Sequence, residues 1–560
     1  MRKLSTFLGV STLTLVIVLT ISLGTSVNVN AQDPTDPNSL GVRDACTSIM
    51  VGCNASTDGS VMTAHACDAR YRTWMKWEPA KIYDLKGDDK GATETIYKGM
   101  LHTADEFDSH RLTKVGEIPQ VPQVYSFLNT AYPCLNEKQL AIGETTIGGS
   151  EILRNKNGMF LIEELEKIAL ERCDNARDAI RIIGELVEKY GYGDWGECIT
   201  IADTKEVWQL EIFGAGPDKI GSVWAAERIP DGNIGVSANI CRISTLSEKI
   251  LKNTDYYMAS ENVFSLAKKL NLWDGKSEFK FWKVYGDVDS YTKVLKPFWT
   301  REYFILNHFA PSLHLNMDME ELPFSVKPDN KVSVEDVMAM YREVYEDTQW
   351  DMTKNLKMAK EIKDEDGNVI RIDSVRIPIA NPWMNGDDRK SINALKPGAV
   401  EYQRVVAVAW CSYTFIAQLR DWLPDEIGGR IFLSFDNAAQ SPRIPIYCGM
   451  NTLPQEFSVC GQHGVKEDAI IWNYRKANKL ATVSWQNTKE LHTSYLMHFQ
   501  DEMMKDCPIV ESRVQELLKA GKKDEATKYL NNYTRDFVGA TSYAWHELEK
   551  IYWRKFDMGF

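Results

Sequence analysis

The order of helical and strand-like segments constrains the fold of this 560-residue chain most. Residues 160–190 carry apolar side chains at helical spacing in two blocks, which are broken near Cys173 and closed by Gly191. Runs rich in β-branched and aromatic residues follow at 197–213 and 219–239, bounded by Asp-Thr, Gly and Pro-Asp-Gly turns. Helices before and after blocks of strands are typical of an α/β fold in which helices cover the sheets.

Further elements are expected in the second half of the chain. Residues 334–347 predict a helix, and three apolar runs predict strands at 404–410, 430–435 and 443–448. From about Trp485 to the end, the sequence is charged and periodic, which predicts helices.

The first 31 residues have the three parts of a secretory signal peptide. Two basic residues precede an apolar run over 7–24, and small residues lead to a cleavage site after Ala31. A membrane anchor is the alternative, since the apolar run approaches the ~18 residues that span a bilayer, but no basic stop-transfer cluster follows it. Cys46 lies too far from this run to be a lipid-attachment site. We therefore expect export to the periplasm or the extracellular space, with no membrane contact after cleavage.

Charge and cysteine content narrow the classes of function. A net charge of -13 at pH 7, with no basic patch interleaved with aromatic residues, argues against a nucleic-acid partner. Export would permit disulfides among the eleven cysteines, and their odd number leaves at least one thiol unpaired. The sequence holds no CxxC pair and no HExxH motif, so its spacing predicts no metal site.

Cys46 opens a predicted hairpin over 46–68 directly after a polar segment. Residues 32–45 are rich in Pro, Asp, Asn and Gly and predict a flexible, removable linker. If this linker is cut before Cys46, the residue carries a free α-amine beside its own thiol. Such an amine titrates near ~7.7–8.0, so one residue can supply both a nucleophile and a base at neutral pH. The alternative is an ordinary buried or disulfide-bonded cysteine.

Five blocks between Cys46 and about residue 500 occur in a recognisable order: "CTSIMVGCNASTDGSVMTAHACD", "LNEKQLAIGETTIGGSEIL", "RIIGELVEKYGYGDWGECITIADTKEVWQLEIFG", "RIPDGNIGVSANICRI" and "AQLRDWLPDEIGGRIFLSF". They resemble the cysteine-dependent dipeptidase family that includes dipeptidase A and the secernins. The resemblance implies an N-terminal nucleophile hydrolase, an αββα sandwich of two antiparallel sheets between helical layers. It also implies that exposing the cysteine activates the precursor and that no metal or organic cofactor is required. The expected organisation is a signal peptide at 1–31, a propeptide or linker at 32–45, a hydrolase domain at 46–484 and a C-terminal helical extension at 485–560.

The resemblance assigns roles to three residues. Cys46 matches the nucleophile, with its α-amine as base and proton shuttle. Asp68 matches an aspartate that contacts this amine or the amino group of the substrate, and a turn residue at the end of the hairpin is the alternative. Asn239 matches an asparagine of the oxyanion hole, and a strand-end residue that caps a turn is the alternative.

Three further residues are predicted to contact the substrate: His65, Arg70 and Glu144. Relatives usually carry an arginine at the position of His65. Histidine titrates near ~6.5, so we expect stabilisation of the thiolate to be weaker or dependent on pH. Arg70 or Arg72 could supply the missing charge, and the sequence leaves this open. Glu144 lies on a strand that approaches the cleft in relatives and is a candidate ligand for a substrate amine, with a solvated strand position as the alternative.

The expected activity is hydrolysis of short peptides, chiefly dipeptides, by acyl transfer through Cys46. Two alternatives are an amidase for N-acylated small molecules, as in the bile-salt and penicillin V branch of the scaffold, and a secreted binding protein without catalysis. The blocks "ADTKEVWQLE" and "LRDWLPDEIGGR" favour the peptide substrate. The sequence leaves open the side-chain preference, the disulfide pairing and the oligomeric state, including a homo-oligomer.

Overall fold

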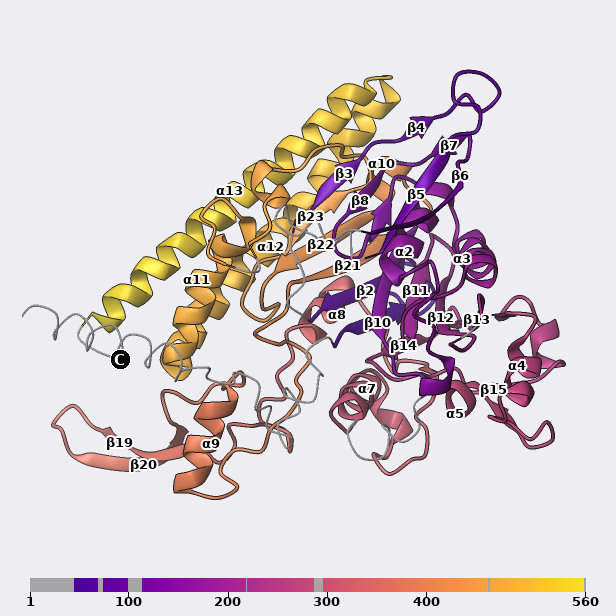
Figure 1. Cartoon of the computed structure of the whole chain (residues 1–560). Helices are drawn as coiled ribbons and strands as arrows, with labels where there is room; N and C mark the ends of the chain where they lie inside the picture. The colour runs from indigo at the N-terminus through magenta and orange to yellow at the C-terminus, as the bar shows by residue number, and fades with distance from the viewer. Residues whose placement is uncertain are drawn as a thin grey trace, which may run out of the picture. The chain divides into compact units, whose positions relative to one another are not determined.

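Two antiparallel sheets dominate the described part of the chain (Figure 1). The computed structural model describes residues 45–68, 74–98, 113–217, 219–286, 296–461 and 464–557. Residues 44–560 belong to one compact unit, and the predicted boundary between 484 and 485 stays a prediction.

The first sheet carries the predicted hairpin at its centre. In spatial order, its seven described strands are β18 (Ser325–Val326), β14 (Ile234–Ser237), β1 (Thr47–Val51), β2 (Val61–Cys67), β21 (Tyr413–Leu419), β22 (Arg430–Phe435) and β23 (Ile444–Tyr447). β1 pairs with β2 so that Ser48 lies opposite His65, and every residue of both strands is buried. The hairpin and the strands predicted at 430–435 and 443–448 are therefore confirmed.

The second sheet packs on the first. Its eight described strands are β16 (Tyr257–Ala259), β13 (Ser222–Arg228), β12 (Val207–Gly214), β11 (Glu197–Ala202), β10 (Ala141–Thr146), β9 (Leu135–Asn136), β8 (Phe127–Asn129) and β3 (Lys76–Glu78). β10 packs against β2, and Gly143 lies at this contact. A Cβ atom on Gly143 would come 3.0 Å from the Cβ atom of His65 and 2.9 Å from Oγ1 of Thr200. The missing side chain thus lets the two sheets approach closely beside His65.

Two helices cover the outer face of the second sheet. They are α2 (Ile162–Arg172) and α3 (Ala176–Tyr190), which confirms the two helices predicted over 160–190. The side chain of Asn175 accepts a hydrogen bond from a backbone N–H in the first turn and caps α3. Gly191 ends α3 with a φ of 85°, a conformation that glycine adopts without steric cost.

Three long helices cover the outer face of the first sheet, on the side opposite α2 and α3 (Figure 1). They are α11 (Ile470–Val483), α12 (Trp485–Lys519) and α13 (Lys523–Phe556). The helices predicted from Trp485 are confirmed, and the helical region begins earlier, at Ile470. The two sheets between two helical layers are the predicted αββα arrangement.

A buried carboxylate ties α12 to the first sheet. Glu511 accepts two hydrogen bonds from Arg420, at 2.8 and 3.0 Å, and one from Nη1 of Arg430 at 2.6 Å. Arg420, Arg430 and Glu511 are 5%, 6% and 8% exposed. Arg420 directly follows β21 and Arg430 begins β22, so the carboxylate fixes α12 against two neighbouring strands.

The strand predicted at 404–410 is wrong, because this segment is a buried loop. Val405, Val406 and Val408 are buried, which explains the apolar pattern. The guanidinium group of Arg404 reaches the backbone carbonyl of Ala45 at 2.9 Å. An apolar run is equally compatible with a strand and with a loop that packs inside the protein.

The helix predicted over 334–347 is confirmed at its start and ends early. α8 (Val334–Met340) begins at a capping box formed by Ser333 and Asp336. Tyr345 and Asp347 have φ values of 61° and 62°, in the left-handed region that a right-handed helix excludes.

The remaining described elements surround the two sheets. The other helices are α4 (Val263–Lys269), α5 (Phe281–Tyr285), α7 (Lys296–Phe309), α9 (Gly386–Leu395) and α10 (Asp425–Gly428). Four short strand pairs are β4 (Lys81–Ile82) with β7 (Gln123–Val124), β5 (Thr93–Lys98) with β6 (Thr113–Pro119), β15 (Thr245–Leu246) with β17 (Phe279–Lys280), and β19 (Lys357–Lys363) with β20 (Val369–Arg376).

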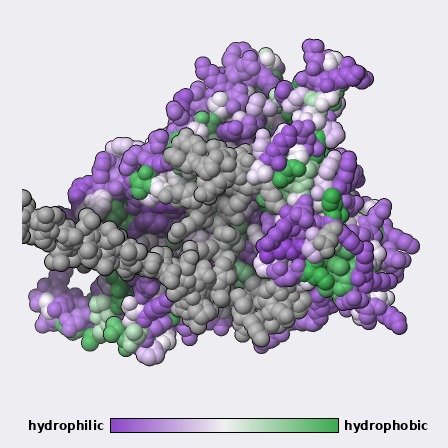
Figure 2. Space-filling view, in the orientation of Figure 1, coloured by the Kyte–Doolittle hydropathy of each residue, from purple (hydrophilic) through white to green (hydrophobic). Residues whose placement is uncertain are grey.

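On the face drawn in Figure 2, hydrophilic residues predominate and hydrophobic residues form small separate patches. Within the described ranges, no helix combines the length and the apolar character needed to cross a membrane. The predicted signal peptide at 1–31 and the predicted linker at 32–45, apart from Ala45, lie outside the described residues.

Candidate active site

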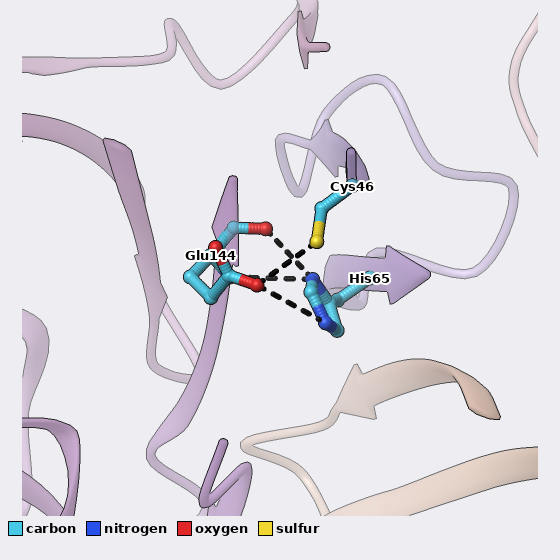
Figure 3. A group of neighbouring side chains, drawn as sticks. All are labelled: Cys46, His65 and Glu144. Carbon is cyan, nitrogen blue, oxygen red and sulfur yellow. Dashed lines mark hydrogen bonds and ion pairs between the residues drawn. The ribbon is translucent and has the colours of Figure 1, made fainter. Parts of the chain in front are cut away.

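Cys46 lies directly before β1 and is 1% exposed. Its Sγ donates a hydrogen bond to Oε1 of Glu144 on β10 at 3.0 Å. The site is therefore built across the contact between the two sheets, with the sulfur on one sheet and the carboxylate on the other. Figure 3 shows Cys46, which precedes β1, pointing toward His65 of β2 and Glu144 of β10.

His65 comes from β2 and faces the same carboxylate. Its Nδ1 atom lies 2.7 Å from the backbone oxygen of Glu144, and its Nε2 atom lies 3.7 Å from Oε1. The rings of Tyr132, Tyr413 and Phe415 surround the imidazole, with centroid distances of 6.0, 6.0 and 5.7 Å. Burial lowers the pKa of His65 to about 4, so the imidazole is neutral at neutral pH.

Asp68 follows β2 and pairs with a cation from a distant segment. Its Oδ2 accepts a hydrogen bond from Nη2 of Arg404 at 2.7 Å, and both side chains are almost fully buried. The same Nη2 atom donates to the carbonyl oxygen of Ala45 at 2.9 Å. Burial raises the pKa of Asp68 above its usual range, although Arg404 opposes this shift. Arg404 thus holds both the carboxylate and the peptide bond that precedes Cys46.

Arg301 of α7 connects Cys46 to Asn239. One nitrogen, Nη1, donates to the carbonyl oxygen of Cys46 at 2.7 Å, and Nη2 donates to Oδ1 of Asn239, also at 2.7 Å. Burial lowers the pKa of Arg301 to about 9, which leaves the guanidinium charged at neutral pH. The backbone of Asn239 is left-handed, with a φ of 70°, directly after β14.

The side-chain amide of Asn239 already donates one hydrogen bond. Its Nδ2 atom lies 2.8 Å from the carbonyl oxygen of Thr146, at the end of β10. An amide nitrogen carries two hydrogens, so with respect to the described residues one is left for an oxyanion. The role of Asn239 in an oxyanion hole stays a prediction.

The thiol of Cys46 is protonated in this arrangement. Burial is the main cause that raises the pKa of Cys46 well above its ordinary value, and contact with Cys67 and the negative charge of Glu144 act in the same direction. Formation of a thiolate therefore requires a base close to the sulfur that accepts its proton.

A group of buried carboxyls lies behind Glu144. It consists of Glu163 and Glu166 on α2 and Glu197 on β11, all at most 2% exposed. Burial raises the pKa of Glu163 to about 8 and raises the pKa of Glu166 and Glu197 well above the usual range. These carboxyls are therefore neutral at neutral pH, which limits the negative charge behind the nucleophile.

The structure brings five predicted site residues into one region: Cys46, His65, Asp68, Glu144 and Asn239. Arg70 and Arg72 lie outside the described residues, so their part in the site stays a prediction.

Sequence reasoning missed Arg301 and Arg404, which supply positive charge around Cys46. Arg301 belongs to no motif, and Arg404 lies in a segment with the pattern of a strand. Their hydrogen bonds reach across 255 and 359 residues of sequence, so no local pattern indicates them.

Three donor atoms of the site could hold a metal ion. The Sγ of Cys46, a ring nitrogen of His65 and a carboxylate oxygen of Glu144 all lie within 4.8 Å of one another. Sequence spacing cannot reveal this group, because strand pairing and sheet packing bring the three residues together.

Comparison with known proteins places this chain among the peptidases. Residues 45–497 match peptidase family C69. A probable dipeptidase of Latilactobacillus sakei is 24% identical over 461 residues, which cover 79% of this chain and 84% of that protein. Probable dipeptidase B of Lactococcus lactis is 24% identical over 510 residues, 86% of this chain and 92% of that protein. Dipeptidase A of Lactobacillus helveticus is 21% identical over 500 residues, 87% of this chain and 94% of that protein.

The family match covers most of the chain, so the protein is a peptidase. It belongs to peptidase family C69, which confirms the resemblance to the dipeptidase family seen in the sequence.

Proposed function

We propose that this protein is an exported cysteine dipeptidase whose nucleophile is the thiol of Cys46, made N-terminal by removal of the preceding residues. The observation that carries the proposal is the position of the 45–46 peptide bond. Its carbonyl oxygen accepts a hydrogen bond from Arg404, and the next carbonyl accepts one from Arg301. Two buried cations thus fix the backbone on both sides of the Cys46 nitrogen.

Cleavage before Cys46 changes the chemistry of one atom. While Ala45 is attached, the nitrogen of Cys46 is an amide and accepts no proton at neutral pH. After cleavage it is an amine that titrates near ~7.7–8.0 and can take the thiol proton. Burial raises the pKa of the Cys46 thiol well above its ordinary value, so a base close to the sulfur assists its attack.

The reaction then follows the steps of acyl transfer. The sulfur of Cys46 attacks the carbonyl carbon of the substrate while the α-amine takes the thiol proton. The C–N bond breaks, the ammonium gives its proton to the leaving amine, and a thioester remains. Water hydrolyses the thioester to an acid and restores the thiol. The free N–H of Asn239 is the candidate donor to the developing oxyanion.

A pocket of about 750 Å³ has a lining that includes Thr300, Tyr402 and Gln403. Thr300 and Gln403 are next to Arg301 and Arg404 in the sequence, but none of the five predicted site residues that the structure describes lines this pocket. The names of the curated relatives support dipeptides as substrates.

Two measurements test the proposal. The intact mass of the mature exported protein should correspond to a chain that begins at Cys46. A panel of free dipeptides and N-acylated amines should show turnover of the dipeptides, and turnover of the acylated amines alone would favour the amidase.

Replacement of the nucleophile separates catalysis from binding. Cys46→Ala should abolish hydrolysis, and Cys46→Ser should reduce it strongly, because a hydroxyl is a poorer nucleophile at neutral pH. The half-buried thiol of Cys53 lies outside the site, so Cys53→Ala is the matched control and should retain activity. Hydrolysis that persists in Cys46→Ala would refute the assignment.

A further inference from the structure

The three side chains in Figure 3 have the chemistry of metal ligands as well as of a hydrolase. A cysteine sulfur, an imidazole nitrogen and a carboxylate oxygen are the three ligand types that bind Zn²⁺ in proteins. The distance from Sγ of Cys46 to Oε1 of Glu144 is 3.0 Å, and Nε2 of His65 lies 3.7 Å from the same oxygen. The sulfur of Cys46, a ring nitrogen of His65 and a carboxylate oxygen of Glu144 all lie within 4.8 Å of one another.

The imidazole presents Nε2 to the carboxylate of Glu144, at 3.7 Å from Oε1. Nδ1 of His65 lies 2.7 Å from the backbone oxygen of Glu144 and 3.4 Å from its backbone nitrogen. The shorter contact is with a carbonyl oxygen, which can only accept a hydrogen bond, so we assign the ring proton to Nδ1. The lone pair of the neutral ring is then on Nε2. Within the described part of the chain, Nε2 has no hydrogen-bond partner although it is fully buried.

A hydrogen bond from one ring nitrogen to a backbone carbonyl is also the usual support of a metal-binding histidine. It fixes the tautomer and the orientation of the ring. His65 therefore has both the free lone pair and the outer hydrogen bond that a ligand requires.

The spacing of the donor atoms fits tetrahedral coordination. With Zn–S bonds of ~2.3 Å and Zn–N or Zn–O bonds of ~2.0–2.1 Å, neighbouring ligand atoms are about 3.3–3.7 Å apart. The two distances of 3.0 and 3.7 Å need only small side-chain adjustments to reach these values. Three protein ligands leave a fourth position for water or for the α-amine of a processed Cys46.

We propose that Cys46, His65 and Glu144 form a binding site for a thiophilic divalent cation such as Zn²⁺, which competes with the peptide for the nucleophile. Binding forms an S–metal bond, and the thiol proton passes to solvent as the thiolate forms. The bound sulfur cannot attack a carbonyl, so the metal acts as a reversible inhibitor. The inhibitory part of this inference rests on the proposed function, whereas the metal site itself does not.

Co²⁺ is the probe that reports the ligands directly. Added to the full chain, Co²⁺ should produce the near-ultraviolet charge-transfer band of a cobalt–thiolate bond together with the intense visible bands of tetrahedral cobalt. Zn²⁺ should displace it with a stoichiometry of one ion per chain, as measured by competition with a chromophoric chelator. A spectrum with only the weak bands of octahedral cobalt would overturn the proposal, whatever the variants show.

Two variants remove single ligands. His65→Gln and Glu144→Gln should each weaken Zn²⁺ binding by at least ~10–100-fold, since loss of an outer hydrogen-bond partner alone has an effect of this size. Cys53→Ser removes a thiol outside the site and should keep the affinity of the unmodified protein. Far-ultraviolet circular dichroism checks the fold of each variant. Equal affinity in folded His65→Gln and in the unmodified protein would refute the site.

The activity measurement distinguishes this inference from the proposed function. Zn²⁺ should inhibit dipeptide hydrolysis, and a chelator should restore it. If Zn²⁺ leaves dipeptide hydrolysis unchanged and Co²⁺ gives no thiolate band, the metal site is refuted and the dipeptidase activity is not. A cobalt–thiolate band in a protein that hydrolyses no dipeptide would support the metal site and refute the proposed function.

Discussion

Removal of the carboxylate of Glu511 should destabilise the whole fold. This carboxylate lies between the guanidinium groups of Arg420 and Arg430, and all three side chains are less than a tenth exposed. In Glu511→Ala, both arginines stay buried without a counter-charge. Loss of one partner of a buried ion pair typically costs about 3–5 kcal/mol. We expect the free energy of unfolding of Glu511→Ala to fall by about this amount.

A second variant separates the loss of stability caused by the missing charge from the loss caused by the missing hydrogen bonds. Glu511→Gln keeps one acceptor oxygen for the arginines and loses the charge, so its loss of stability should be smaller than that of Glu511→Ala. Activity per folded molecule should remain unchanged, because the hydrogen bonds of Glu511 go to Arg420, Arg430 and Tyr447 and to none of the candidate active-site residues that the structure describes.

Urea unfolding followed by circular dichroism measures these changes. The matched control is Glu516→Ala on the same helix. Glu516 pairs with Arg513 at 2.9 Å, but both side chains are more than half exposed. An exposed pair is worth at most about 1 kcal/mol, so the control should differ little from the unmodified protein. If Glu511→Ala and Glu516→Ala lost equal stability, the reasoning from buried charge would be wrong.

Two further predictions concern the layer behind the nucleophile. Gly143→Ala should lower the free energy of unfolding by roughly 1–3 kcal/mol and reduce activity, because the added methyl group presses on His65 and Thr200. Urea unfolding and dipeptide turnover test this prediction. An unaltered midpoint of urea unfolding would contradict it. Stability should also fall as the pH rises, because burial raises the pKa of Glu163 from 4.5 to about 8. The folded chain holds a proton that the unfolded chain releases, so this stabilisation is complete below about pH 4.5 and is lost as the pH rises through about 8. For one group, the free energy of unfolding changes by at most ~1.4 kcal/mol per pH unit. Glu163→Gln should reduce this dependence on pH, as measured by urea unfolding between pH 5 and 8. An equal dependence in the variant would exclude Glu163 as its source.

Part of this fold is predictable from residues that lie close together in the sequence. The two helices over 160–190 were predicted because their apolar spacing is helical and Gly191 can adopt the positive φ that ends a helix. The hairpin that begins after Cys46 was predicted for the same kind of reason, since its turn residues lie between two apolar runs. Both depend on residues close together in the sequence.

Long-range contacts made the rest unpredictable. The apolar run at 404–410 has the composition of a strand, yet it packs as a loop in which Arg404 binds Asp68 and the carbonyl oxygen of Ala45. Glu163 and Glu166 have the composition of a solvated helix face and instead lie buried and neutral behind Glu144. Their neutrality arises from burial, which depends on how the sheets and helices pack.

The state of the eleven cysteines has a consequence for a chain that is exported as proposed. Within the part of the chain that the structure describes, all of these cysteines except Cys53 are buried. Tight packing therefore shields their sulfur atoms from oxidants. Such a chain must complete folding before an oxidant reaches its interior, and any later local opening would trap it in mispaired, inactive forms.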